Sequence, residues 1–525
     1  MPNESPTVGA ESRTPEHAGV VLGTLILVAG VANLNLTVAN VALPAIGTAL
    51  SASQLNLNLI AVGYSLGLAA SVLWFGALGD RYGRKRMIVI GMSLAMPASL
   101  VAGIAPSTEV LIAARVIGGL GAGLTFPTTL ALITVLWSGP ARTRAIALWS
   151  ALGTGSAVLG PLVSGALLQV FPWGSVFLVT IPLALLGLVL AVQFVPSGLA
   201  ESAEPVDNYG GLLSALMVGA LVVALNIVAA PNLQVLALVL IGIAVVVAVL
   251  FVLRQRRAPN PLYDLEVARR PTFWVAAVAG IIIFGALMGV LFINQQYLQN
   301  VLGYGSLAAG AAILPAVVVM VLIAPMSARL VAAWGSRRTL LTGQSILGLA
   351  FVAMLLLWGE DTPYVVVVIP LLLMGLGIGL AQTPSANSLT SSVPLRRAGM
   401  ASGTADLQRD LGGAVMTSIF GALLTAGYAS AMAAAGAASG QEITAETQNQ
   451  LQMSYAGAAQ IAAAHPQYAD QIIAAARDSF LHGDRLAYTA GFVAVLLGLT
   501  LVRFFYPDKE TEQQLHATWA AEEEH

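Results

Sequence analysis

The chain has 525 residues, of which 57% are hydrophobic and only 9% are charged. A soluble domain carries roughly a quarter charged residues, so this composition excludes an ordinary soluble protein and indicates many membrane-spanning helices. The net charge of −2 gives no reason to expect a nucleic-acid partner. Because the chain has no cysteine, disulfides, thiol catalysis and thiolate metal sites are excluded.

Fourteen apolar segments are long enough to cross a bilayer, since a transmembrane helix needs about twenty apolar residues. Residues 1–16 are polar and lack the basic region of a cleavable signal, so we expect the first segment to stay in the membrane. Most Lys and Arg residues fall in alternate connections, which the positive-inside rule places, with both termini, in the cytoplasm. We therefore expect a multi-pass protein of the cytoplasmic membrane. The segments lie near 18–44, 54–79, 87–105, 109–136, 145–170, 176–195, 210–230, 233–253, 272–300, 306–333, 339–358, 364–390, 400–428 and 486–505.

The turn between the second and third segments reads GALGDRYGRKRM, residues 76–87. A loop that only sets topology would need the cations but neither the glycines nor Asp80. We expect Asp80 to pair with a neighbouring Arg or with the positive N-terminus of another helix. The turn resembles the loop between helices 2 and 3 of the major facilitator superfamily, and the resemblance implies a cytoplasmic gate that closes on a second helix. Its residues are Gly76, Asp80, Arg81, Gly83, Arg84 and Lys85.

An internal repeat divides the chain. YGRKRMIVIG (82–91) matches WGSRRTLLTG (334–343), and PARTRAIA (140–147) matches PLRRAGMA (394–401) at nearly the same offset. Two matches at one offset indicate two six-helix halves, and such parallel repeats are typical of this superfamily, with the substrate site between them. We therefore expect an all-α membrane protein with the major facilitator fold: two six-helix bundles plus two inserted helices.

The expected domain boundaries follow from this repeat. They are a cytoplasmic N-terminal tail (1–16), a first bundle (17–195), linkers with an inserted two-helix hairpin (196–271), a second bundle (272–505) and a cytoplasmic tail (506–525). The second bundle contains an external helical loop, residues 429–482, with a break at Pro466. The acidic tail is expected to be mobile.

In the first segment, NLNLTVANVALPAI resembles a stretch typical of fourteen-helix drug:proton antiporters. Asn35 stands where those proteins have an acid, so a role in proton coupling or cation pairing is not carried over to it. Asn35 and Asn40 remain candidates for hydrogen bonding to a substrate.

The fourth segment contains Arg115. A buried Arg in hydrocarbon costs several kcal/mol unless it is paired or reaches water, so we expect it to face the central cavity. It resembles the family's helix-4 arginine, which is linked with proton transfer, although Gly118 stands where that motif has Gln. The alternative is a structural role, as a donor to backbone carbonyls.

The fifth segment reads GTGSAVLGPLVSGALL. Small residues let helices approach closely and proline bends a helix, so a packing face alone would explain the pattern. At this position it also resembles the signature that marks exporters within the superfamily, with Ser164 in place of one glycine. The residues that carry the resemblance are Gly155, Gly160, Pro161 and Gly165.

The thirteenth segment holds the only carboxylates expected well inside a helix. Asp406, Arg409 and Asp410 are spaced to share one helical face, near the midplane of the membrane. Two carboxylates with one cation can share a proton and titrate as a unit. We hypothesise that Asp406 replaces the acid missing at Asn35; the alternative is a static ion pair.

Uncharged polar residues complete the candidates. Gln295 and Gln299 lie four residues apart in the ninth segment, and Gln408 lies in the thirteenth. Polar groups in hydrocarbon need partners, so these residues either line a substrate cavity or join helices.

The resemblance implies proton-coupled efflux of amphiphilic drugs or other small molecules by alternating access. The expected partners are a small-molecule substrate, protons and the lipid bilayer, and we expect a monomer without cofactor or metal. An enzyme is not expected, because no nucleophile–base pair, phosphate loop or metal-ligand spacing stands out. The alternatives are a dedicated exporter of one metabolite, lipid or self-made antibiotic, and a non-transporting membrane scaffold or sensor organised around 429–482.

Overall fold

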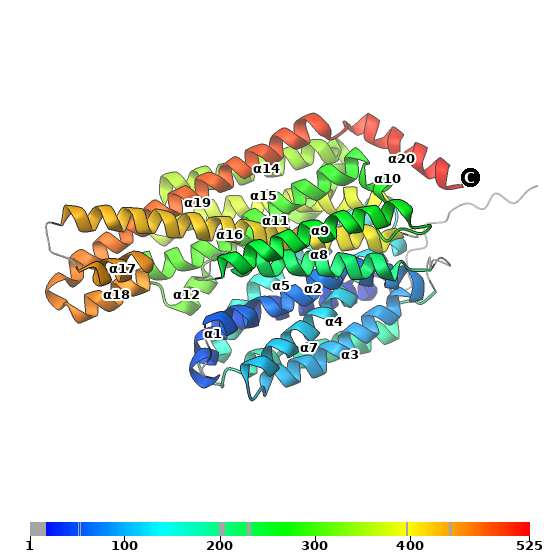
Figure 1. Ribbon diagram of the computed structural model, residues 1–525. Coiled ribbons are helices and arrows are strands. Elements are labelled where there is room, and N and C mark those ends of the chain that lie inside the picture. Colours follow the sequence, from blue (N-terminus) through cyan, green and yellow to red (C-terminus); the bar gives the residue numbers. More distant parts are fainter. Residues whose placement is uncertain are drawn as a thin grey trace, which may run out of the picture.

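Long helices running side by side make up the structure, a computed structural model (Figure 1). It describes residues 17–524 except 51, 53, 199–204, 228–232, 395–396 and 440–443, and these residues contain no strand. The expected N-terminal tail, residues 1–16, lies outside them. Within the described residues, fourteen helical stretches are long and apolar enough to cross a membrane, as the sequence predicts.

The first half of the chain packs as one group of helices. α2 and α3 both pack on α4, and α1 packs on α5. This group occupies the lower part of Figure 1, in blue and cyan. Its elements are α1 (Ala18–Leu50), α2 (Gln54–Tyr82), α3 (Arg84–Gly103), α4 (Thr108–Leu136), α5 (Gly139–Leu167), α6 (Ser175–Leu178) and α7 (Thr180–Phe194).

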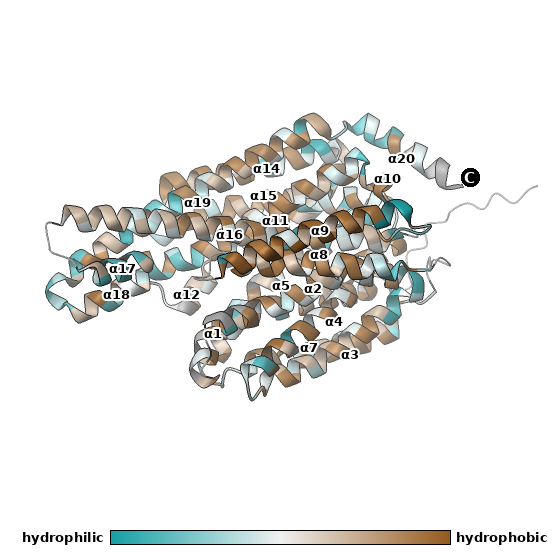
Figure 2. Cartoon of the chain, viewed as in Figure 1, coloured by the Kyte–Doolittle hydropathy of each residue, from teal (hydrophilic) through white to brown (hydrophobic). Residues whose placement is uncertain are grey.

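The inserted pair consists of α8 (Asn208–Ile227) and α9 (Gln234–Arg257), followed by the short α10 (Leu265–Ala268). α8 packs on α2 of the first half and on α16 of the second, and α9 packs on α8. Apolar side chains of α9 remain exposed, and Figure 2 colours the helix as hydrophobic along most of its length. Such a surface suits contact with lipid tails.

The second half repeats the plan of the first. In particular, Gly83 between α2 and α3 and Gly335 between α13 and α14 both have a positive φ, 99° and 84°. A residue with a side chain rarely adopts this conformation, so the matched glycines of the repeat make the same turn. The elements are α11 (Pro271–Gln296), the π-helical η1 (Tyr297–Val301), α12 (Ser306–Ala311), α13 (Leu314–Trp334), α14 (Ser336–Leu357), α15 (Tyr364–Ser391), α16 (Ala398–Ala438) and α19 (Ala469–Phe505).

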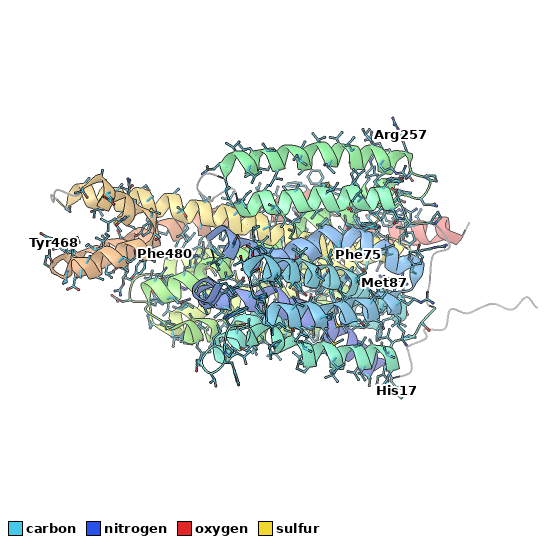
Figure 3. All side chains as sticks on the ribbon, turned by 60° about the horizontal axis from the view of Figure 1, so that its bottom comes forward. His17, Phe75, Met87, Arg257, Tyr468 and Phe480 are labelled. Carbon is cyan, nitrogen blue, oxygen red and sulfur yellow. The ribbon has the colours of Figure 1, made fainter. Side chains whose placement is uncertain are left out.

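Two helices of this half extend beyond the rest. α16 continues to Ala438 and α19 already begins at Ala469, with α17 (Ala445–Met453), α18 (Tyr455–Ala464) and the 3-10 turn η3 (Pro466–Tyr468) between them. In Figure 3, Tyr468 lies at the far end from His17, Met87 and Arg257. The last span was expected to start near residue 486, so the structure differs. Alanine-rich sequence continues both helices, because alanine has the highest intrinsic helix propensity.

The C-terminal residues form α20 (Lys509–Glu524). Its first residue donates from Nζ to the carbonyl of Ala332 at 2.8 Å. Tyr506 donates to Glu512 at 2.9 Å, and the guanidinium of Arg270 lies 4.2 Å from the centre of the Trp519 ring. The expectation of a mobile tail is therefore wrong.

Candidate functional site

A small cavity of about 20 Å³, with room for about one water molecule, lies between the two halves. The first half contributes aromatic and small side chains from α4 and α5, and the second contributes α11, α15 and α16. The site thus lies where helices of both halves meet. Its lining residues are Phe126, Trp149, Ser150, Gly153, Phe284, Ala386, Ala405, Asp406, Gln408 and Arg409.

Asp406 is the acidic group of this cavity. It is 1% exposed, and its Oδ2 has no hydrogen-bond partner among the described residues. One turn further along α16, Arg409 Nε lies 3.7 Å from Asp410 Oδ1. The Arg409 guanidinium also lies 3.9 Å from the centre of the Phe126 ring, across the boundary between the halves. The structure therefore brings the predicted cluster together, although Asp410 does not line the cavity.

This arrangement has one more carboxylate than cation. Two ionised carboxylates beside one guanidinium would leave a net negative charge in a nearly dry site, which is costly. A proton on either carboxyl removes that charge. The cluster can therefore take up a single proton, and Asp406 is the carboxyl of the cluster that lines the cavity.

Gln408 lines the same cavity. Its amide nitrogen reaches Ser385 Oγ at 3.5 Å, while its Oε1 has no hydrogen-bond partner among the described residues. Gln295 and Gln299 do not line it; the amide of Gln299 donates instead to the Gln295 carbonyl at 3.3 Å. Of the uncharged candidates, Gln408 alone lies at the cavity.

Arg115 is held elsewhere. Its guanidinium donates to backbone carbonyls of α1 and α2, to Asn35 at 2.6 Å, Ile60 at 3.3 Å and Leu36 at 3.4 Å. The side-chain amide of Asn35 donates to Val31 of its own helix at 3.2 Å. Neither residue lines the described cavity, and Asn40 is exposed. This geometry matches the alternative role for Arg115, and its part in proton transfer stays a prediction.

Sequence reasoning missed Tyr64 on α2. The residue is 4% exposed, and its ring lies 4.9 Å from the Arg115 guanidinium. The charges of Arg115, and of Arg409 and Asp410 in the other half, all act on its hydroxyl. A single tyrosine in an apolar helix gives no signal in the sequence for this position.

The Asp80 turn contacts the second half. Asp80 Oδ1 pairs with Arg84 at 2.5 Å, and its Oδ2 accepts a hydrogen bond from the backbone N–H of Gly399 at 2.8 Å, in the first turn of α16. Gly76 and Gly399 let the two backbones approach, since a Cβ at Gly76 would lie 2.7 Å from the Gly399 carbonyl oxygen. Nearby, Lys85 donates to the Val192 carbonyl at 2.7 Å. Both partners expected for Asp80, an arginine and a helix N-terminus, are present.

The exporter-like segment of α5 is a packing face. A Cβ at Gly160 would overlap the side chain of Thr37 on α1, and Thr37 donates from Oγ1 to the Ala157 carbonyl at 2.7 Å. Ser164 donates to the Val38 carbonyl at 2.8 Å. On the other side, Gly155 faces Val317 of α13. The segment thus joins α1 to α5 and α5 to the second half; Pro161 lies within α5, and Gly165 lies near Leu307.

Comparisons with known proteins agree with this geometry. Residues 25–417 match the Major Facilitator Superfamily. The multidrug efflux pump LfrA of Mycolicibacterium smegmatis is 34% identical over 93% of this chain and 95% of that protein. The multidrug resistance protein Stp of Mycobacterium tuberculosis is 34% identical over 75% of this chain and 73% of the length of Stp.

A solved structure of the proton:xylose symporter XylE superposes with a TM-score of 0.59 at 13% identity, over 95% of this chain and 98% of the other. At that identity the likeness concerns the fold alone. The family match covers most of the chain, and the helical repeat, the Asp80 turn and the cavity between the halves agree with it. The chain belongs to the major facilitator superfamily.

Proposed function

We propose that this protein exports amphiphilic compounds across the cytoplasmic membrane by alternating access, with protons moving inward in exchange. The observation that carries the proposal is the buried Asp406 carboxyl in an aromatic-lined cavity between the two halves. The names of LfrA and Stp, a multidrug efflux pump and a multidrug resistance protein, support the class of cargo. Phe126, Trp149 and Phe284 offer apolar ring surface to such cargo.

Coupling follows when proton and cargo favour different conformations. Asp406 and Asp410 share the charge of Arg409, so a proton gained or lost there changes the net charge of the cavity. A ligand shifts a conformational equilibrium only by its differential affinity for the two states. A proton that binds Asp406 from the outside would favour release of the cargo there. Cargo that binds from the inside would favour release of the proton into the cytoplasm.

Orientation and assembly are part of this proposal. Arg254, Arg256 and Arg257 close α9 at the end of the molecule that also holds Met87, and the positive-inside rule assigns that end to the cytoplasm. Both termini would then be cytoplasmic, and α17 and α18 external. We further propose a monomer whose bundles span 17–195 and 272–505, without catalytic activity of its own.

The test uses inverted membrane vesicles containing the full chain, with ethidium as the probe. We expect uptake that a protonophore abolishes, and an Asp406→Asn variant at least about a hundredfold slower, the low end of the range typical of proton-transferring groups. The matched control is Asp361→Asn, since Asp361 is an exposed carboxylate outside the cavity. Uptake at the same rate with and without a proton gradient, or a fully active Asp406→Asn variant, would contradict proton coupling.

The same vesicles separate the alternatives. Uptake of several cationic and neutral dyes supports a multidrug exporter. Uptake confined to one compound would indicate a dedicated exporter. If no compound is taken up, the non-transporting scaffold or sensor becomes the favoured alternative.

A further inference from the structure

A second carboxyl group is buried far from the central cavity. Asp484 on α19 is 2% exposed, and neither of its oxygens has a hydrogen-bond partner among the described residues. It lies twenty-one residues before Phe505, the last residue of α19, which places it about 30 Å from that end at 1.5 Å per residue. Asp484 therefore lies near the membrane boundary opposite the Asp80 turn, and the central cluster does not include it.

Aromatic side chains surround Asp484. Tyr297 of η1 stacks on Trp358, the residue that follows α14, with ring centres 4.9 Å apart. Trp358 in turn meets Tyr488, one turn beyond Asp484 on α19, at 5.6 Å. The hydroxyls of Tyr488 and of Tyr428 on α16, and the indole nitrogen of Trp358, have no hydrogen-bond partner among the described residues.

No cation compensates this carboxyl within the described residues. The charge of Asp484 acts on the hydroxyls of Tyr297 and Tyr488, and Tyr455 of α18 lies beside Tyr428. The titratable groups that face the region from η1, α16 and α18 are thus tyrosines, and the uncharged Trp358 follows α14 there. On α19 itself, His482 and Arg485 are exposed, and Arg477, two turns before Asp484, is half-buried with no hydrogen-bond partner for its Nε among the described residues.

The packing beside Asp484 is tight. A Cβ at Gly427 of α16 would lie 2.6 Å from the Gly483 Cα of α19, and a Cβ at Gly483 would lie 2.5 Å from the Leu424 carbonyl oxygen. The two helix backbones therefore touch directly beside the carboxyl. A hydrated cation does not fit such a contact, and a buried ionised carboxylate without a partner is very costly. The ligand that removes the charge of Asp484 without moving a helix is a proton.

We propose that Asp484 is a second proton-binding site, which holds a proton in this conformation and releases it to water when α19 separates from α16. The step is the loss of H⁺ from the carboxyl O–H, which leaves a hydrated carboxylate. Since α16 also carries Asp406 and Asp410, movement of this one helix would link the two sites. The use of the proton in transport rests on the proposed function; its presence on Asp484 does not.

The first experiment is infrared spectroscopy of the full chain in lipid nanodiscs near neutral pH. We expect the wild type to show the carbonyl stretch of a protonated carboxyl that Asp484→Asn lacks. Asp478→Asn, which removes an exposed carboxylate from the same helix, should retain it. A difference spectrum between wild type and Asp484→Asn without that band would overturn the proposal.

The second experiment measures gradient-driven ethidium uptake by the same variants in inverted vesicles. We expect Asp484→Asn to lose about a hundredfold in rate while ethidium binding and thermal unfolding stay near wild type, and Asp484→Glu to recover part of the rate. A well-folded Asp484→Asn variant with undiminished proton-driven uptake also overturns the proposal. If the wild type shows no gradient-driven uptake, the proposed function fails, and the infrared band still decides whether Asp484 holds a proton.

Discussion

Asp80 joins two helices that belong to different halves. One carboxylate oxygen pairs with Arg84 in its own turn, and the other accepts the Gly399 N–H at the start of α16. A negative charge is favoured at a helix N-terminus, where backbone N–H groups lack partners within the helix. Because the contact crosses between the halves, it exists only while they are closed at this end.

The Asp80→Asn substitution tests this contact. Asparagine keeps an acceptor but loses the charge. A charge at a helix N-terminus contributes about 1 kcal/mol, so its loss should lower the equilibrium constant for the closed conformation roughly fivefold. We expect slower protonophore-sensitive ethidium uptake at a normal level of inserted protein. Asp361→Asn, at an exposed position, is the control. Wild-type uptake by Asp80→Asn would show that the contact does not limit transport.

Local patterns predicted some residues well and others not. The partners of Asp80 and the clustering of Asp406, Arg409 and Asp410 follow from a short motif and from helical spacing, which the sequence contains. The partners of Arg115 depend on how α1 and α2 pack against α4, and no local sequence pattern specifies that packing. Asp484 lies between the expected external loop, which ends at residue 482, and the expected last span, which begins near residue 486, because the flanking polar residues lower the local hydropathy, although the helix continues through them.

Among the elements, α16 connects three sites. Its 41 residues extend over about 60 Å as one helix. The first turn holds the Gly399 contact to Asp80, the next turns carry Asp406 and Asp410, and Tyr428 lies further along beside the Asp484 region. A tilt of α16 would therefore change the surroundings of all three sites together. The shorter helix expected from the sequence, which ends near residue 428, contains the same three sites.

α20 contacts the same end of the molecule. Trp519 lies against Arg270 at the start of α11, and the charges of Arg142 on α5 and of Arg270 both act on His516. Burial first, and then these two cations, lower the pKa of His516 from its usual 6.5. Burial raises the pKa of Glu512. The helix therefore lies against charged residues from both halves.

The pKa shifts of His516 and Glu512 make the docking of α20 depend on pH in opposite directions. A lowered pKa in the docked helix means that His516 favours docking above pH 6.5, and that this contribution is lost as the pH falls through the lowered pKa. The raised pKa of Glu512 favours docking at low pH, and that contribution is lost as the pH rises through the raised pKa. In the wild type the two effects partly offset each other.

His516→Gln isolates the histidine. Glutamine stays neutral, so we expect the variant and the wild type to dock α20 equally above pH 6.5 and the variant to dock it more tightly well below that pH. Hydrogen exchange of residues 509–524, compared between the two proteins at each pH, measures this and cancels the intrinsic pH dependence of exchange. Equal protection at low pH would show that His516 does not control docking.

At the scale of the whole molecule, the two halves meet at several points near the Asp80 end. Besides the Gly399 contact, Thr143 at the start of α5 donates to the side chain of Asn387 on α15 at 3.3 Å. The sequence repeat predicted two related halves and a site between them. It could not predict which end is closed, because both conformations of such a transporter use the same sequence and differ only in which contacts between the halves are made.

This closed end can be fixed covalently. Since the chain has no cysteine, the double substitution Thr143→Cys and Asn387→Cys introduces a single pair of thiols where the two side chains already meet. Oxidation, or a short reagent that bridges two thiols, should link α5 to α15 if the Cβ atoms come within about 4.5 Å. We expect the link to stop gradient-driven ethidium uptake and a reductant to restore it, while each single-cysteine variant stays active under the same treatment. Alternating access requires the halves to separate at this end in every cycle, so fully linked protein that still takes up ethidium at the wild-type rate would exclude that mechanism.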